Sequence, residues 1–161
     1  MALVFIGLGS NLGDGCLNLT QAWKKLGELK NITPLALSSP YLSEPVGIET
    51  KTWFTNAVGV VESKLTPEEM LAELLEVEKE MGRNRLSGKD RTIDLDILYY
   101  DDVVINKPTL EIPHPEMHKR LFVLAPLEEL APDHKHPILQ QTSRYMKQTL
   151  PAEYNVKKIS W

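Results

Sequence analysis

Hydrophobic residues fall along the chain in short continuous runs and in stripes of helical spacing, which predicts both strands and helices. Residues 2–8 are apolar throughout, as in a strand buried within a sheet. Apolar positions then recur at near-helical spacing over 17–26 and predict a helix. Two more apolar stretches, 30–42 and 53–62, predict further strands, and the segment 43–52 between them predicts a long loop.

The clearest helix signal begins at Thr66. Thr66 is a residue of the N-cap type, and Pro67 stands at the first helical position. Glu68 and Glu69 suit the positive end of the helix dipole. Apolar residues then form one face as far as Gly82, which is a suitable residue to end the helix. The pattern therefore predicts a capped helix between Thr66 and Gly82.

The second half of the chain continues the alternation of elements. In chain order it predicts a basic loop at 83–91, a strand at 92–100, a turn at 101–102 into a short partner strand at 103–105, helices near 115–130 and 138–149, and a last strand at 155–160. Helices and strands joined by hairpin-like links predict an α+β sandwich with a mostly antiparallel sheet. We expect one domain over residues 1–161, because this length suits a single hydrophobic core.

Composition narrows the possible functions. The chain has 18 Lys and Arg against 22 Asp and Glu, a formal net charge of −4. It lacks the general basic field that gathers nucleic acid or anionic lipid, so we expect neither partner, and an RNA-binding module is the least favoured class. Cys16 is the only cysteine, and the N-terminal residues carry no basic leader. Together these features favour a cytoplasmic protein.

The most informative polar residues are Asp94 and Asp96. On a strand, residues i and i+2 project to one face, so the two carboxylates lie together, about 6–7 Å apart at the backbone. They repel each other unless something neutralises them. A divalent cation does so, and Mg²⁺ held by one or two carboxylates and substrate phosphates is a common arrangement. The alternative is an exposed face whose aspartates pair with arginines of the 83–91 loop. Asp is disfavoured in strands, which favours the functional interpretation.

Basic residues stand near these acids in the sequence. The 83–91 loop contains Arg83 and Arg91, and a later Pro-rich segment contains His114 and Arg120. Guanidinium, ammonium and imidazole groups suit the phosphates that a metal would bridge. The alternative for the loop is a solvated charge run with no ligand.

Aromatic residues stand at the edges of the predicted loops. Phe54 opens a strand and is followed by Asn56, and Phe122 follows Arg120. Paired rings with an amide nearby suit a flat heterocycle that is stacked on its faces and bound at its edge. On the residues alone, ordinary core packing is the favoured interpretation.

Several segments together resemble the 6-hydroxymethyl-7,8-dihydropterin pyrophosphokinase family of folate biosynthesis. The resemblance runs in order over roughly residues 4–130. Its segments are Gly-Ser-Asn-Leu-Gly at 9–13, Ser-Ser-Pro-Tyr at 38–41, Glu-Pro-Val-Gly at 44–47, Phe-Thr-Asn-Ala at 54–57, Arg-Thr-Ile-Asp-Leu-Asp-Ile-Leu at 91–98, Ile-Pro-His-Pro at 112–115 and Arg-Leu-Phe-Val-Leu-Ala-Pro-Leu at 120–127. The block at 91–98 beside the Pro-His-Pro segment is the most specific.

The resemblance implies a fold and an activity. It implies a three-layer α-β-α sandwich of ferredoxin-like type, with a mostly antiparallel sheet. The implied enzyme transfers pyrophosphate from ATP to the hydroxymethyl group of the dihydropterin and releases AMP. Two Mg²⁺ ions serve as cofactors and ATP is the co-substrate. We expect a monomer, with another folate enzyme as its potential functional neighbour.

The resemblance also implies residue roles. Asp94 and Asp96 match the metal ligands. Arg83 and Arg91 join the two aspartates as catalytic residues. The positions matching the ATP site are Leu71, Glu78, Arg83, Arg91, Ile97, Leu110, His114 and Arg120. Those matching the pterin site are Ser43, Val46, Phe54, Asn56, Asp94 and Phe122.

The chain departs from the family pattern in one loop and at one isolated position. The segment before the aspartates, 86–91, is about one residue shorter than the family's Arg-Trp-Gly-Pro-Arg-Thr and lacks its Trp. Thr109 stands where some members have a phosphate-binding Arg. Since the aspartates, the histidine and the key arginines remain, we expect an active enzyme. Two alternatives stay open, a Mg²⁺-dependent kinase that releases ADP and a non-catalytic ferredoxin-like binding domain.

Overall fold

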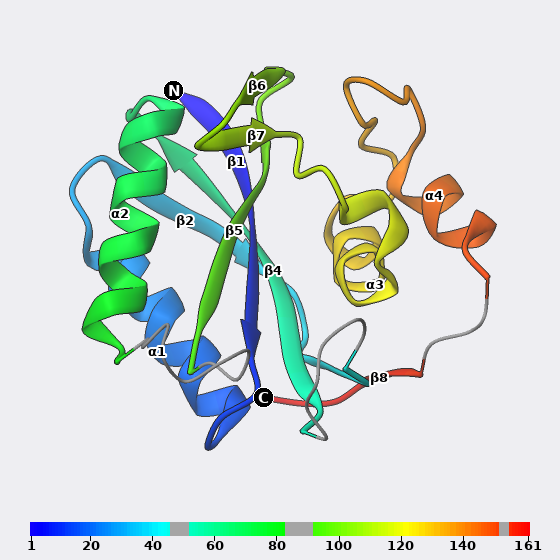
Figure 1. Cartoon of the computed structure of the whole chain (residues 1–161), viewed down its shortest axis with the longest axis horizontal. Helices are drawn as coiled ribbons and strands as arrows, with labels where there is room; N and C mark the ends of the chain where they lie inside the picture. Colours follow the sequence, from blue (N-terminus) through cyan, green and yellow to red (C-terminus); the bar gives the residue numbers. More distant parts are fainter. Residues whose placement is uncertain (46–51, 83–91, 152–154) are drawn as a thin grey trace.

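The first strand, β1 (Ala2–Ser10), lies inside a sheet and has a partner on each side (Figure 1). The computed structural model describes residues 1–45, 52–82, 92–151 and 155–161. β1 pairs antiparallel with β4 (Phe54–Ser63) and with β5 (Asp94–Tyr100). The strand order is β5-β1-β4-β3-β8, and β2 also pairs with β4. The apolar run at 2–8 therefore forms the buried strand that its pattern predicts.

The other elements complete the sheet and its two coverings. The remaining strands are β2 (Ile32–Leu37), β3 (Tyr41–Ser43), β6 (Ile105–Lys107), β7 (Leu110–Ile112) and β8 (Val156–Lys158). The helices are α1 (Gly15–Glu28), α2 (Pro67–Glu80), α3 (Leu121–Leu130) and α4 (Ser143–Thr149), with a 3₁₀ turn η2 (Met117–Lys119) before α3. All strand pairs in the described part of the chain are antiparallel.

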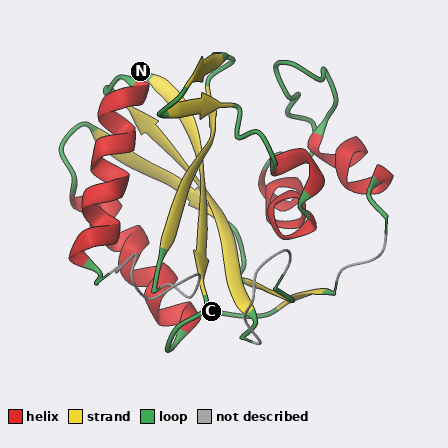
Figure 2. Cartoon of the chain, in the orientation of Figure 1, coloured by secondary structure: helices red, strands yellow, loops and turns green. Residues whose placement is uncertain are grey.

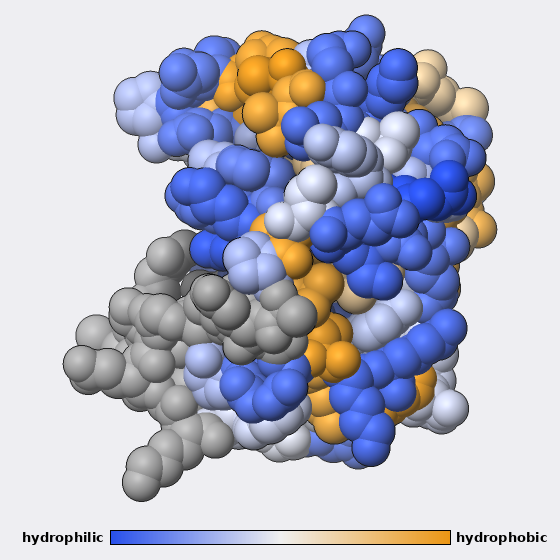
Figure 3. All heavy atoms as spheres, turned by 90° about the vertical axis from the view of Figure 1, so that its right-hand side faces the viewer, coloured by the Kyte–Doolittle hydropathy of each residue, from blue (hydrophilic) through white to orange (hydrophobic). Residues whose placement is uncertain are grey.

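Helices cover both faces of the sheet, which makes three layers (Figure 2). Val4, Ile6 and Leu8 of β1 face α1 and α2 and join a hydrophobic core with those helices. On the opposite face, Phe5 and Val58 join a second core with residues of α3 and α4. Viewed from the α3 and α4 side, the surface is mostly hydrophilic, with a hydrophobic patch near the top and a hydrophobic strip below it (Figure 3). The predicted α+β sandwich with a mostly antiparallel sheet is confirmed.

The start of α2 also follows its sequence signal. Thr66 accepts a hydrogen bond from the backbone N–H of Glu69, and the Glu69 carboxylate accepts one from the Thr66 N–H. This reciprocal capping box satisfies two donors that a helix start otherwise leaves unpaired. The helix runs to Glu80, two residues before Gly82, which adopts a positive φ of 83°.

The prediction of one strand over 30–42 is wrong, because the chain forms β2 and β3 with a break between them. Ser38 lies in the break and is fully buried. Its N–H donates to the Val58 carbonyl, and its hydroxyl oxygen accepts from the Val58 N–H at 3.0 Å. Pro40 follows and has no N–H for a strand ladder. A serine side chain thus replaces part of the ladder, and the strand is interrupted.

The predicted pairing of 103–105 with the preceding strand is also wrong. After β5, Asp101 adopts a φ of 50° and bonds back to β1, donating its N–H to the Leu3 carbonyl and accepting the Leu3 N–H. These bonds hold the turn against β1, so the chain leaves the sheet. β6 then pairs with β7 in a separate two-stranded sheet.

The two predicted C-terminal helices are shorter than expected. The first divides into η2 and α3, and the second begins only at Ser143. Residues 131–142 form turns instead, with a bridge between Lys135 and Thr142. The predicted last strand is present as β8, which pairs with β3. No helix in the described ranges is long and apolar enough to span a membrane.

Two histidines of the 131–142 turns pack over β1 and β5. His134 lies against Phe5 and Tyr99, with ring centroids 4.9 and 4.7 Å away. His136 is 4% exposed, and its Nδ1 accepts the backbone N–H groups of Ile138 and Leu139. Burial, followed by the nearby His118 and His134, lowers the pKa of His136. His136 is therefore held in the neutral form.

Acid should weaken the fold through His136. Its pKa is lower in the folded chain than its ordinary value of about 6.5, so below that pH the unfolded chain binds more protons and stability falls. His136→Asn keeps an acceptor for the same N–H groups but does not titrate. We expect its free energy of unfolding in urea to fall less than wild type between about pH 7.5 and about pH 5.5. Equal losses in the two proteins would contradict this account.

Candidate active site

Polar residues of three neighbouring strands meet across Gly9. In the β1 register, Gly9 stands opposite Asn56 on β4 and opposite Asp94 on β5. Residues directly opposite each other in antiparallel strands project to the same face. A Cβ on Gly9 would lie 3.1 Å from Asn56 Oδ1, so the missing side chain leaves room for the amide. Asn56 and Asp94 therefore share one face, with only backbone between them.

The second aspartate extends this row. Asp96 stands opposite Gly7, one pleat along β1. The register then shifts between Phe5 and Ile6, which leaves Leu98 as an extra residue on β5. Such β-bulges often occur beside functional sites. The prediction that Asp94 and Asp96 share a face is in accord with their common placement opposite the two glycines.

His114 lies beside Asp96. Its backbone N–H donates to the Leu98 carbonyl at 3.1 Å, which ties the segment after β7 to the bulge. Its Nδ1 accepts the Glu116 N–H at 3.1 Å, and its Nε2 is 4.0 Å from Asp96 Oδ2. Because Nδ1 is an acceptor, neutral His114 carries its proton on Nε2, on the side of Asp96.

Burial and charge favour this neutral form of His114. Burial is the main cause that lowers its pKa, and the positive charge of Arg120 adds to the effect. Asp94 and Glu116 act in the opposite direction without reversing it. At neutral pH, His114 is therefore a hydrogen-bond donor through Nε2 rather than a fixed cation.

Besides Asp94 on β5, the described residues predicted for the pterin come from β3, β4 and α3. Ser43 and Asn56 are buried, and Asn56 Nδ2 donates to Ser43 Oγ at 2.7 Å. Phe54 stands opposite Ser43 in the pairing of β3 with β4 and is partly buried. Phe122 is partly buried on the first turn of α3, with the Arg120 guanidinium carbon 5.7 Å from its ring centroid.

Four of the residues predicted for the ATP site lie on β5 or on α2 and β7, which pack against it. Leu71, Ile97 and Leu110 pack in or against the core below α1 and α2. Ile97 consequently faces away from Asp94 and Asp96. The Glu78 carboxylate is 4% exposed and accepts the Leu95 N–H of β5 at 2.8 Å. Glu78 thus supports the strand that carries the aspartates.

Some predicted site residues lie outside the described part of the chain, and some residues of the site were not predicted. Val46, Arg83 and Arg91 lie outside the described residues. Gly7 and Gly9 were not predicted as site residues, although Gly9 opens the Gly-Ser-Asn-Leu-Gly segment at 9–13. Two glycines at alternate positions near the end of an otherwise apolar strand were the available signal.

Two carboxylates, an amide and a neutral histidine at one end of an antiparallel sheet suit an enzyme that handles phosphate groups. Residues 5–132 match the model of the 7,8-dihydro-6-hydroxymethylpterin-pyrophosphokinase (HPPK) family. The chain therefore belongs to the HPPK family, the pteridine pyrophosphokinases of folate biosynthesis. Membership of this family implies that the enzyme uses ATP and a pterin.

Relatives from two bacteria cover almost the same length. The 2-amino-4-hydroxy-6-hydroxymethyldihydropteridine pyrophosphokinase of Haemophilus influenzae is 40% identical over 161 residues, with 99% of each chain covered. That of Aquifex aeolicus is 40% identical over 148 residues, with 91% of each chain covered. The chain is also similar to a crystal structure of Plasmodium falciparum HPPK-DHPS, with a TM-score of 0.74 at 16% identity. It covers 44% of that longer chain, and 91% of its own length is matched.

Glu78 offers a test of what holds β5 in place. Glu78→Ala removes the acceptor of the buried Leu95 N–H, and we expect a loss of about 1–3 kcal/mol in the free energy of unfolding. Glu78→Gln retains an acceptor oxygen and should lose less. Urea unfolding of both variants measures the difference. If Glu78→Ala is as stable as wild type and only its KM for ATP rises, the side chain serves the nucleotide rather than the strand.

Proposed function

We propose that the chain transfers the pyrophosphoryl group of ATP to the hydroxymethyl oxygen of 6-hydroxymethyl-7,8-dihydropterin at the row of residues across Gly9. The observation that supports this location is the placement of Asp94, Asp96 and Asn56 on one face, with His114 4.0 Å from Asp96. The amide suits the edge of a pterin, and the carboxylates and imidazole suit a metal-bound triphosphate.

The carboxylates fit two Mg²⁺ ions shared with the substrate. Among the described residues no group of three or more His, Cys, Asp and Glu side chains forms a complete metal cage. Mg²⁺ at nucleotide sites commonly takes one or two carboxylates and completes its shell with water and phosphate oxygens. Asp94 and Asp96 would hold the ions, which when bound neutralise phosphate charge and polarise the attacking hydroxyl.

The chain's own groups would position both substrates. His114 donates its Nε2 proton to a phosphate oxygen, and Arg120 supplies positive charge. Arg83 and Arg91, by family resemblance, would bind the triphosphate as further catalytic residues. The pterin hydroxymethyl oxygen attacks the β-phosphorus and its proton passes to water. The bond from that phosphorus to the α,β-bridging oxygen breaks, and AMP leaves. Most of the rate would come from alignment and electrostatics, as in other phosphoryl transfers.

The two ligands would occupy adjoining parts of the site. Asn56 binds the pterin edge, Phe54 and Phe122 stack on its faces, and Ser43 and Val46 complete the pocket. Adenosine lies at the β5 edge, near Leu71, Ile97 and Leu110, with Glu78 behind it. These roles are supported by the family resemblance and by the shared faces described above.

We also infer a single domain, since the sheet and both helical layers combine elements from the first and the last parts of the chain. We further propose a monomer in the cytoplasm, a location that the single cysteine favours. In the Plasmodium falciparum structures HPPK is joined to DHPS on one chain. This supports a functional neighbour in the same pathway for the present enzyme.

Product analysis tests the proposed reaction. The protein is mixed with ATP, MgCl₂ and reduced hydroxymethylpterin, and AMP is resolved from ADP by ion-exchange chromatography. We expect AMP that depends on the pterin and disappears when Mg²⁺ is chelated with EDTA. Pterin-dependent ADP would mean a simple kinase and an attack at the γ-phosphorus. Neither nucleotide would mean that the chain binds its ligands without turning them over.

Asp96→Asn tests the metal role. The neutral amide keeps the size of the side chain but lacks the charge for Mg²⁺, and we expect kcat to fall about 100-fold or more. Steady-state rates across a series of Mg²⁺ concentrations measure it. Asp102→Asn, the same change at an exposed turn beyond the far end of β5, is the matched control and should behave as wild type. Near-normal turnover of Asp96→Asn at saturating Mg²⁺ would rule out the ligand role.

A further inference from the structure

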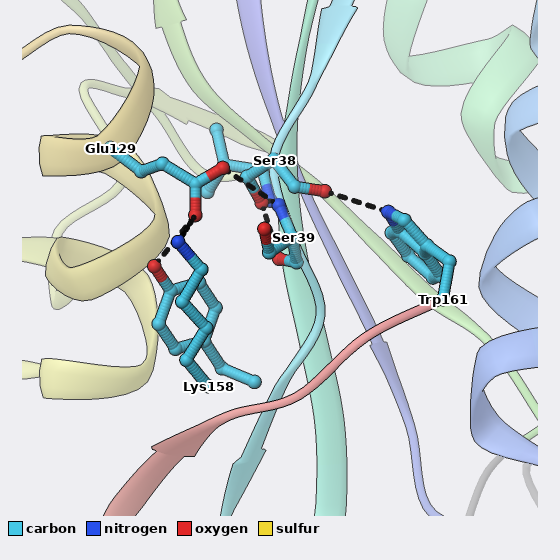
Figure 4. Close-up of polar contacts among 7 residues, drawn as sticks. Ser38, Ser39, Glu129, Lys158 and Trp161 are labelled. Atoms are coloured by element: carbon cyan, nitrogen blue, oxygen red, sulfur yellow. Dashed lines mark hydrogen bonds and ion pairs between the residues drawn. The ribbon is translucent and has the colours of Figure 1, made fainter.

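A carboxylate near the end of α3 joins that helix to three other segments (Figure 4). Glu129 Oε2 accepts the backbone N–H of Ser39 at 2.8 Å, and Oε1 accepts the Tyr41 hydroxyl at 2.8 Å. The Lys158 ammonium on β8 is 3.4 Å from Oε1. One side chain therefore connects α3 to the break between β2 and β3, to β3 itself and to β8.

These contacts fix the position of Glu129 more closely than an exposed ion pair would. Tyr41 is 8% exposed, and the Ser39 bond goes to the backbone, so neither partner can shift without moving the sheet. Burial alone would raise the pKa of the Glu129 carboxyl, but the Ser39 and Tyr41 bonds and the Lys158 charge bring it below its ordinary value. Glu129 is therefore charged at neutral pH and accepts charge-assisted hydrogen bonds.

On the sheet side, this contact lies one pleat from the proposed pterin pocket. Tyr41 stands opposite Asn56 in the pairing of β3 with β4. Ser43 is two residues further along β3, on the same face, and accepts the Asn56 amide at 2.7 Å. A displacement of β3 at Tyr41 would thus move the hydrogen-bond partner of Asn56.

On the helix side, the same contact sets the position of Phe122. Phe122 is seven residues before Glu129 on α3, close to two full turns, so the two side chains lie on one face of the helix. Along the axis they are separated by about 10 Å. Rotation or translation of α3 about its contact with β3 would carry the Phe122 ring with it.

The segment between β2 and β3 that bonds to Glu129 is also bonded to β4 and to the C-terminal residues. Ser38 exchanges two hydrogen bonds with Val58 of β4. The Trp161 indole N–H donates to the Ser38 carbonyl at 3.2 Å, and the Ile159 N–H donates to the Pro40 carbonyl at 2.9 Å. The junction of β2 and β3 is therefore fixed on both sides, and α3 is the member that Glu129 restrains.

We propose that Glu129 is a positioning residue for the pterin, which sets the spacing between Phe122 on α3 and the wall formed by Asn56 and Ser43. It contacts neither substrate. The proposal rests on the proposed function, because it takes Phe122 and Asn56 as pterin contacts. A flat ligand between two walls is sensitive to their separation, so the effect should concentrate on pterin affinity.

The test is steady-state kinetics with each substrate varied in turn. Glu129→Ala removes both acceptors, and we expect the KM for the dihydropterin to rise roughly tenfold. The KM for ATP should rise less, since the β5 edge is untouched and only Arg120, among the described residues of the proposed ATP site, belongs to the α3 layer. Glu129→Gln keeps an acceptor oxygen and should recover most of the pterin affinity. A purely structural role would show no such split between the two KM values.

Glu128→Ala is the matched control. Glu128 is the neighbouring residue on α3 and its carboxylate lies 3.4 Å from the Lys147 ammonium of α4, away from β3. We expect both of its KM values to equal those of wild type. Thermal unfolding of every variant gives the accompanying change in stability. A Glu129→Ala protein that loses stability but keeps the pterin KM of Glu128→Ala would overturn the proposal, and so would equal increases in both KM values.

Two further variants distinguish failure of the positioning role from failure of the proposed pterin pocket. Phe122→Ala should raise the pterin KM more than the ATP KM. If it does and Glu129→Ala does not, the positioning role is wrong and the pocket stands. If Phe122→Ala has no effect on pterin binding, the pocket assignment fails and the positioning role fails with it. Should Glu129→Ala not fold, Tyr41→Phe removes only the hydrogen bond from the Tyr41 hydroxyl to Glu129. An unchanged pterin KM in that variant would equally reject the proposal.

Discussion

The pairing of β1 with β4 on one side and with β5 on the other decides where Asn56 and the two aspartates of the site lie. β1 sends Val4, Ile6 and Leu8 into the core below α1 and α2, and this burial specifies its register. On the opposite face the same register places Gly9 between Asn56 and Asp94. A slip of one residue would turn the aspartates into the hydrophobic core, so the energy of core packing also holds the catalytic geometry.

β5 lies at the edge of the described sheet, and its free backbone groups attach the rest of the site. The Leu95 N–H is satisfied by the Glu78 carboxylate from α2. The Leu98 carbonyl, at the bulge, accepts the N–H of His114 and so brings that imidazole beside Asp96. An exposed strand edge is usually a liability for a protein. Here Glu78 and the backbone of His114 bond to this edge. The same two contacts support the strand of the aspartates and bring the His114 imidazole beside Asp96.

An enzyme of this kind has little covalent chemistry to perform, so its catalytic power depends on how well two substrates are aligned. In the proposed function, the described residues divide that task between two parts of the structure. The sheet carries the aspartates and Asn56, while the α3 layer carries Arg120 and Phe122. Glu129 is a direct polar link between these parts, and its charge-assisted bonds to Ser39 and Tyr41 connect helix position to pocket width.

Local signals in the sequence were sufficient for several features of this protein. The capped start of α2 follows from Thr66 and Glu69, and the common face of Asp94 and Asp96 follows from the alternation of side chains along a strand. The break at Ser38, the pairing of β6 with β7 and the approach of His114 to Asp96 did not follow from local pattern. Nor did the contact of Glu129 with Ser39, which joins residues 90 positions apart. Propensity and periodicity act within a few residues, whereas these contacts depend on strand register and helix packing, which only the assembled core determines.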